Sequence, residues 1–132
     1  MRVFLDTNVL VSAFTTRGLS ADVVRTVLAE HELVTGEFNL DELRRVLGGK
    51  MGVPKRDVVA VERLLRDQTV VARPTAPWPG SVRDADDAWV LASAVAAHAD
   101  VLVTGDQDLL TVKEPPLRVL SPRAFWELAR SR

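Results

Sequence analysis

Val3-Phe4-Leu5-Asp6-Thr7-Asn8, at the start of the chain, is the stretch that decides the fold. Its three apolar residues lead directly into an aspartate, and such a continuous apolar run is typical of a strand buried on both faces in a parallel sheet. Asp6 then lies at the carboxyl end of the strand, where open α/β sheets place their ligands. The alternative is that Asp6 and Asn8 only form the turn and cap the next helix.

The composition limits the kind of protein that the chain can be. Its 132 residues fit one domain, 1–132, and a hydrophobic fraction of 47% with a charged fraction of 27% is typical of globular proteins. The formal net charge is -1, so contact with a nucleic acid needs a local basic patch. The absence of cysteine excludes disulfides and thiolate sites. Because residues 1–15 do not resemble a signal peptide and no apolar run can span a bilayer, we expect a cytoplasmic protein without membrane contact.

Strand and helix patterns alternate along the chain. Short apolar runs predict strands at 1–5, 33–35, 70–72, 101–104 and 118–120, and apolar periodicity predicts helices at 20–30, 39–47, 54–67, 84–98 and 122–130. In the third of these helices, the predicted inner side consists of Val58, Val61, Leu64 and Leu65. Prolines and a glycine predict a loop at 74–83. This order predicts an α/β fold, a single-domain three-layer α/β/α sandwich with a mainly parallel central sheet.

Two of the predicted strands end in the same way. Asp6 follows Val3-Phe4-Leu5, and Asp106 follows Val101-Leu102-Val103-Thr104-Gly105. If these strands are parallel neighbours, both carboxylates emerge at one edge of the sheet, where two like charges are unfavourable unless a proton or a cation lies between them. Oxygen ligands without histidine or cysteine favour a hard cation such as Mg²⁺ or Mn²⁺.

A third group of acids, in Arg83-Asp84-Ala85-Asp86-Asp87, precedes the most apolar helix. Carboxylates are common at helix N-termini, and Asp84 is a candidate N-cap. Three aspartates in four residues exceed the needs of one cap, however. Asp87 adjoins the apolar run, so we expect its side chain to point inward.

Asp41 and Glu42 form a fourth acidic group, near the start of the second predicted helix. Asn39 and Glu42 have the spacing of a capping box, which is the local explanation. Because Leu40 and Leu43 face the core, Glu42 lies at the margin of the buried face and Asp41 points away. Glu42 can therefore reach the predicted edge of the sheet.

Four segments of the chain resemble those of the PIN domain family, in particular the small bacterial ribonucleases of toxin–antitoxin systems. They are Val3-Phe4-Leu5-Asp6-Thr7-Asn8-Val9-Leu10, Leu40-Asp41-Glu42-Leu43, Asp84-Ala85-Asp86-Asp87-Ala88-Trp89-Val90-Leu91-Ala92 and Leu102-Val103-Thr104-Gly105-Asp106-Gln107-Asp108-Leu109-Leu110. The resemblance extends over essentially the whole chain. It implies a PIN-like fold and a Mg²⁺- or Mn²⁺-dependent nuclease that hydrolyses RNA, with a cognate antitoxin as partner and a homodimer as assembly.

The resemblance also assigns roles to individual residues. It implies that four acids are catalytic and hold one or two metal ions, namely Asp6, Glu42, Asp87 and Asp106. From the residues themselves, Asn8 is placed to orient Asp6 by a hydrogen bond, and Thr104 to position a water or a carboxylate. The resemblance adds Asp108 in a lesser part and leaves open whether Asp84 or Asp86 assists Asp87.

Basic and aromatic residues give weaker indications of partner contacts. The candidates for an RNA path are Arg17, Arg44, Arg45, Lys50, Lys55 and Arg56. The alternative is that they lie on solvated helix faces in pairs of the Glu62–Arg66 kind. Trp89 is predicted to be core, whereas Trp78, in the proline loop, is a candidate for a partner or dimer contact.

Three other classes of protein also fit acids at strand ends. A haloacid-dehalogenase-type phosphatase needs a second aspartate where this chain has Asn8 and a suitable lysine, for which Lys113 lacks the context. A signalling receiver domain needs a lysine near its final strand, and residues 118–121 contain none. A catalytically silent PIN-like module that binds RNA or protein is the main alternative, although such modules usually lack some of the four acids.

Overall fold

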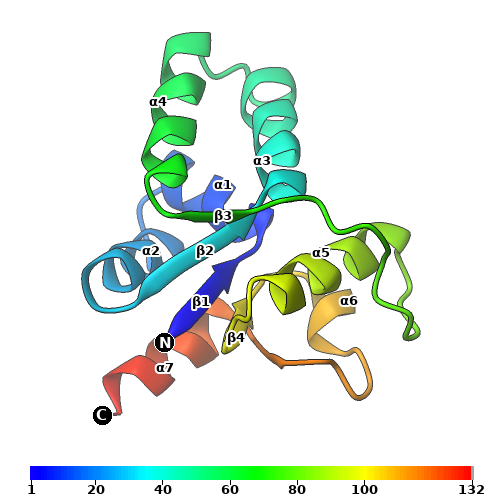
Figure 1. Ribbon diagram of the computed structural model, residues 1–132. Coiled ribbons are helices and arrows are strands. Elements are labelled where there is room, and N and C mark those ends of the chain that lie inside the picture. The colour runs from blue at the N-terminus through cyan, green and yellow to red at the C-terminus, as the bar shows by residue number, and fades with distance from the viewer. Residues whose placement is uncertain (132) are drawn as a thin grey trace.

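The protein is built on one parallel sheet. A computed structural model describes residues 1–131 of the chain. The sheet has the order β3-β2-β1-β4-β5, with every neighbouring pair parallel. Its strands are β1 (Arg2–Leu5), β2 (Glu32–Gly36), β3 (Thr69–Val71), β4 (Val101–Val103) and β5 (Arg118–Leu120) (Figure 1). The predicted sheet is thus confirmed, with β3 one residue earlier than expected.

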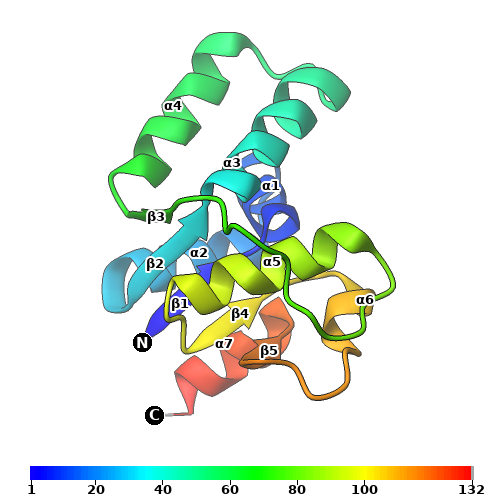
Figure 2. The same ribbon diagram turned by 45° about the vertical axis from the view of Figure 1, so that its right-hand side comes forward.

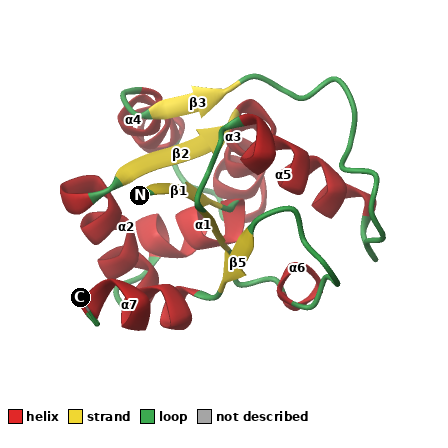
Figure 3. Ribbon diagram, turned by 60° about the horizontal axis from the view of Figure 1, so that its bottom comes forward, coloured by secondary structure: helices red, strands yellow, loops and turns green. Residues whose placement is uncertain are grey.

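Helices cover both faces of this sheet, which confirms the three-layer arrangement. One face carries α1 (Thr7–Thr15), α2 (Leu19–Glu30) and α7 (Pro122–Arg130), and the other carries α5 (Ala85–Ala96) (Figure 3). A helical pair extends from the end of the sheet and consists of α3 (Glu37–Arg44), its π-helical continuation η1 (Arg45–Lys50) and α4 (Lys55–Arg66) (Figure 2). The short helix α6 (Gln107–Leu110) follows β4. No helix within residues 1–131 is long and apolar enough to cross a membrane.

The chain changes sides of the sheet between β1 and β4. The connections from β1 to β2 and from β2 to β3 run through α1 to α4, whereas the connection from β3 to β4 runs through α5 on the opposite face. In the resulting β1–β4 pair, Leu5 lies beside Val103. Ligands of open α/β sheets bind outside the carboxyl ends of the strands at such a switch point. A ligand site is therefore expected at the residues just after β1 and β4.

Two apolar clusters, one on each face, fix β1 in place. Val3 and Leu5 point into the cluster shared with α1, α2 and α7, and Phe4 points into the cluster shared with α5, because side chains alternate along a strand. All three are fully buried. Burying each contributes about 2 kcal/mol, so Asp6 follows a rigid strand.

Two helices, α1 and α6, were not predicted from the sequence. In α1 the segment Thr7–Thr15 is rich in β-branched residues and has no charged face, so its local preference for a helix is weak. Burial of Val9 and Leu10 in the core stabilises the helix despite this weak preference. The α6 helix has only four residues, too few for apolar periodicity to show.

Two expectations within the helical pair were wrong, those for Asn39 and for Leu64. Asn39 does not open α3, which begins at Glu37, so the Asn39–Glu42 capping box does not exist. The helical segment continues through Gly48 and Gly49 as η1, beyond the predicted range of 39–47. Leu64 is 40% exposed, since α4 packs only along the side that carries Val58, Val61 and Leu65.

Trp78 clamps the proline loop to the protein, and because its side chain is only half-buried, the predicted partner contact stays a prediction. Its backbone amide donates to the carbonyl of Ala88, and its ring packs against the cluster on the α5 face. Trp89, predicted to be core, is half-buried and lies outside both clusters. The loop itself is confirmed, since residues 72–84 contain no helix or strand.

Gly80 is needed for this clamp. A Cβ at this position would lie 2.1 Å from the Trp78 ring, so we expect Gly80→Ala to displace the ring and lower the free energy of unfolding by about 1–2 kcal/mol. Denaturant unfolding and the tryptophan emission spectrum measure both effects. Gly49→Ala is the matched control, because nothing lies within 4 Å of its added methyl group. An unchanged emission spectrum in Gly80→Ala would contradict the clamp.

Candidate active site

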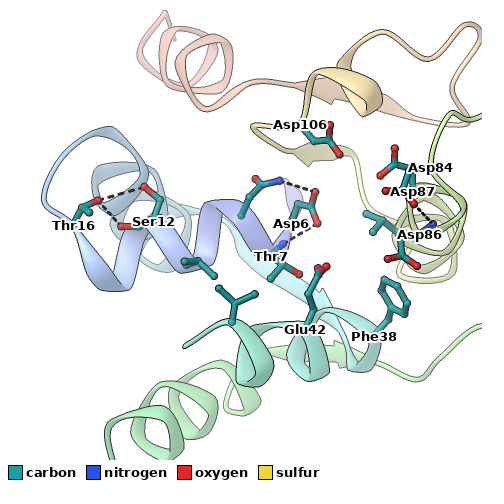
Figure 4. A pocket seen from close by; sticks show the side chains of 14 residues that line it. Asp6, Thr7, Ser12, Thr16, Phe38, Glu42, Asp84, Asp86, Asp87 and Asp106 are labelled. Atoms are coloured by element: carbon teal, nitrogen blue, oxygen red, sulfur yellow. Dashed lines mark hydrogen bonds between the residues drawn. The ribbon is translucent and has the colours of Figure 1, made fainter. Parts of the chain in front are cut away.

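An acid-lined pocket opens at the switch point of the sheet. Its volume is about 470 Å³, and its walls come from the residues after β1 and β4, from α1, from α3 with η1, and from the start of α5. Its apolar side is formed by Val11, Phe38, Val46 and Val90. The acids in its wall are Asp6, Glu42, Asp84, Asp86, Asp87 and Asp106 (Figure 4). All four acids that the sequence singled out as a set are thus brought together.

Hydrogen bonds hold both carboxylate oxygens of Asp6. Oδ1 accepts from the backbone amide of Thr7 at 2.8 Å and from Nδ2 of Asn39 at 3.1 Å. Oδ2 accepts from the hydroxyl of Thr104 at 2.8 Å and from Nδ2 of Asn8 at 3.3 Å. Asp6 is therefore the N-cap of α1 and also a fixed acid in the wall of the pocket.

Thr104 connects Asp6 with the next strand end. Its hydroxyl donates to Asp6 and accepts from the backbone amide of Asp106 at 3.0 Å. Asn8 spans the same gap, because its Oδ1 accepts from the amide of Gly105 at 2.9 Å. Both side chains thus join the carboxylate of Asp6 to the backbone that follows β4.

Burial raises the pKa of two of these acids. The pKa of the Asp6 carboxyl rises from its ordinary value of 3.8 to about 6, because burial outweighs the hydrogen bonds that favour its charged form. The pKa of Asp87 rises to about 7, first through burial and then through the charges of Asp106 and Asp84. The pocket thus holds more negative charge than its surroundings stabilise.

Asp87 carries the clearest sign of a missing partner. It lies in the first turn of α5, is 5% exposed and faces the pocket, as expected from its position beside the apolar run. Its Oδ2 is buried without a hydrogen-bond partner among residues 1–131. Asp84 is the N-cap of α5, and its side chain accepts from the amide of Asp86. The cap is therefore satisfied by Asp84, and the carboxylate of Asp87 is left for another purpose.

A cation fits the donors at the α6 margin of the pocket. Carboxylate oxygens of Asp87, Asp106 and Asp108 lie within 4.8 Å of one another. Asp106 is also the N-cap of α6 and accepts from the amide of Asp108 at 2.9 Å. Hard cations such as Mg²⁺ take oxygen ligands of this kind, and a cation would satisfy the orphaned oxygen of Asp87.

Glu42 and its neighbour Asp41 point in different directions. Glu42 lines the pocket, whereas Asp41 pairs with Arg44 at 2.5 Å and with Arg73. The hydrogen bond from Arg73 and the charge of Arg44 lower the pKa of Asp41. The helical spacing therefore separated these two acids correctly.

Asn39 is the site residue that the sequence reasoning missed. It is fully buried inside α3, and its Nδ2 donates to Asp6 Oδ1 and to the hydroxyl of Thr7, each at 3.1 Å. The amide must present its nitrogen to Asp6, because an amide oxygen there would repel the carboxylate. Its position three residues before Glu42 looked like a cap, and no local signal distinguished the two roles.

Removing this contact should weaken metal binding. In Asn39→Ala, Asp6 loses one fixed donor, and we expect the affinity for Mn²⁺ to fall by about 10- to 100-fold. The control is Thr35→Val, because the buried Thr35 hydroxyl donates to the carbonyl of Leu5 and does not touch Asp6. Calorimetric titration of both variants measures the difference. Equal affinities in the two variants would show that Asn39 has only a structural role.

None of the basic residues proposed for an RNA path lines this pocket. Among the residues that the structure describes, none of its lining residues is lysine or arginine. Arg44 is held by Asp41 and Glu62, and with Lys55 it lines a separate hollow between η1 and α4. Arg44 thus fits the alternative of helix faces with local pairs, and the Glu62–Arg66 pair is present at 2.9 Å. An RNA path over the other candidates stays a prediction.

A parallel α/β fold with carboxylates gathered at its switch point is thus the class that the structure defines. Within that class, the chain belongs to the PIN domain family, since the family model described as "PIN domain" matches residues 2–108. Membership of this family excludes the alternatives of a phosphatase and a receiver domain. No curated protein sequence matches the chain.

Solved structures of toxin–antitoxin proteins share this fold. VapBC2 from Rickettsia felis, bound to a DNA fragment from its promoter, has a TM-score of 0.68 at 16% identity, over 92% of this chain and 98% of that chain. VapBC-1 from nontypeable Haemophilus influenzae has a TM-score of 0.62 at 20% identity, over 93% and 99%. VapC20 from Mycobacterium tuberculosis, a Sarcin-Ricin loop cleaving toxin, has a TM-score of 0.60 at 16% identity, over 85% and 97%.

Proposed function

We propose that the protein is a metal-dependent ribonuclease that hydrolyses RNA phosphodiester bonds as the toxin component of a toxin–antitoxin system. The observation that carries the proposal is the buried oxygen of Asp87 that has no partner within residues 1–131, in a pocket lined by other acids. A cluster of this kind is unfavourable without a cation, and membership of the PIN domain family supports a nuclease.

The proposed metal ligands are Asp6, Glu42, Asp87 and Asp106, with Mg²⁺ or Mn²⁺ as the ion. When bound, the ion activates water and stabilises negative charge on the scissile phosphate. Asn8 and Thr104 orient Asp6, Asp84 anchors the start of α5, and Asp108 supplies a further oxygen beside Asp87. These four supporting residues fix the acids before the substrate arrives.

The proposed partners follow from the same family. An antitoxin is proposed because the solved structures of similar fold include VapBC and FitAB complexes. A cationic side chain of such a partner would neutralise the acids of the pocket. The family resemblance further supports a homodimer, which sedimentation would detect. RNA as substrate and the lack of cysteine agree with action in the cytoplasm.

Adjacent acids on α3 provide a sharp test of this function. We expect Glu42→Gln to cleave RNA about 100-fold more slowly than the wild type, because it removes a charge from the pocket. Asp41→Asn is the matched control and should cleave at the rate of the wild type, because Asp41 pairs with arginines outside the pocket. Full activity in Glu42→Gln would contradict the proposed ligand set. A wild type that binds RNA but never cuts it would favour the catalytically silent module.

A further inference from the structure

A second hollow adjoins the acidic pocket on the side of α6. It has a volume of about 270 Å³ and lies between residues 81–83, just before α5, and residues 111–113, just after α6. Asp108 is part of its wall and also belongs to the triad with Asp87 and Asp106. A group bound in this hollow would therefore lie beside the proposed metal site.

This hollow carries basic side chains, whereas the charged side chains of the pocket are all acidic. Arg83 and Lys113 bring two cations to it, Ser81 adds a hydroxyl, and Val82 and Val112 are its apolar residues. The side chain of Arg83 is 84% exposed, and its nearest carboxylate oxygen, Oδ1 of Asp108, is 3.6 Å away.

Neither of these two cations is held by a hydrogen-bonded carboxylate within residues 1–131. The contact of Arg83 with Asp108 is too long for a hydrogen bond, and within residues 1–131 Lys113 has no ion pair. By contrast, Arg66 holds Glu37 at 2.7 Å and Glu62 at 2.9 Å. Arg83 is therefore only loosely compensated, by Asp108 at 3.6 Å, and Lys113 has no ion pair within residues 1–131.

An RNA strand carries a negative charge on every phosphate and therefore needs a cationic site on the protein. The chain carries a formal charge of -1, and the acidic pocket itself repels phosphate. The backbone at the hollow is held in place, because Val82 packs against the α5-side cluster and Trp78 is bonded to α5. Arg83 therefore extends from an anchored segment at the margin of the pocket.

We propose that the hollow between residues 81–83 and 111–113 binds a backbone phosphate of the RNA strand, next to the phosphate that is cut. This proposal rests on the proposed nuclease function and names Arg83 and Lys113 as its phosphate-binding residues. Contacts to phosphate carry no base information, so the subsite positions the strand and does not select its sequence.

Fluorescence anisotropy with labelled oligo(U) and oligo(A) tests the subsite, with chelator present so that no strand is cut. For the Arg83→Ala/Lys113→Ala double variant we expect binding to weaken about fivefold for each lost cation. The slope of log affinity against log salt should fall by about 0.7 for each lost contact, equally for both RNAs. Arg83→Lys keeps the charge at its position and should retain most of the affinity.

Arg63→Ala is the matched control, because Arg63 is exposed on α4 and has no ion pair within residues 1–131. Equal affinity and salt slope in the double variant and this control would overturn the subsite, as would a wild type that binds neither RNA. Cleavage by the wild type, measured separately with Mn²⁺, decides the nuclease function. The subsite and the nuclease function can therefore fail independently.

Discussion

Asp6→Asn is expected to reduce metal-dependent RNA cleavage by at least about 100-fold while the protein stays folded. The change removes one negative charge from the centre of the pocket and leaves the size of the side chain nearly unchanged. Asparagine caps helices as well as aspartate does, so its Oδ1 can still accept from the amide of Thr7 at the start of α1. We therefore expect the variant to lose cleavage activity while it keeps its fold.

The stability of the same variant separates the two roles of Asp6. Because burial raises the pKa of this carboxyl, its charged form costs free energy in the folded protein at neutral pH. Without metal, Asp6→Asn should be at least as stable as the wild type in denaturant at about pH 8. A large loss of stability would mean that Asp6 serves mainly as a structural cap, and full cleavage activity would remove it from the proposed ligands.

The metal-free wild type is expected to lose about 4 kcal/mol of stability between about pH 5 and pH 8. An acid whose pKa is higher in the folded chain than in the unfolded chain binds its proton more tightly when folded. Its contribution to stability is therefore greatest at low pH and is lost as the pH rises through the folded-state pKa. For Asp6 and Asp87 these values are about 6 and about 7, against an ordinary value of 3.8.

The acids with lowered pKa do not obscure this effect. Glu37, paired with Arg66, and Asp41, paired with Arg73, contribute fully above the ordinary range of a carboxyl group, so they add no slope in the same window. Urea unfolding at several pH values measures the slope. The Asp6→Asn/Asp87→Asn double variant is the control and should show a much weaker pH dependence.

Metal should reverse this loss at high pH. An ion bound only by the folded state at about 100 times its Kd stabilises by about 2.7 kcal/mol, so Mg²⁺ or Mn²⁺ should raise the Tm most where the two carboxyls are ionised. A wild type whose stability is flat from about pH 5 to pH 8, and whose Tm does not respond to metal, would contradict the strained acidic cluster.

Those parts of the site that depend on periodicity could be predicted from the sequence. The apolar runs that end in Asp6 and Asp106 placed both acids at one edge of the sheet, and the structure pairs their strands directly. Helical spacing also placed Glu42 toward the pocket and Asp41 away from it. Each of these inferences needs only the repeat of a strand or a helix.

Those parts that depend on tertiary contacts could not be predicted. Asn39 and a capping residue look alike until β1 and α3 are placed together. Arg44 resembles a free cation in the sequence, and only the fold brings Glu62 of α4 beside it. In the same way, the location of Trp78 against Gly80 and α5 depends on a loop whose path no local pattern determines.

Cleavage of a panel of single-stranded and structured RNAs by the wild type, with Mn²⁺, with Mg²⁺ and with chelator, tests the central claim most directly. We predict cut RNA in either metal, none with chelator, and loss of the metal-dependent products in Asp106→Asn. A folded wild type that neither binds these metals nor cuts any RNA of the panel would contradict the account.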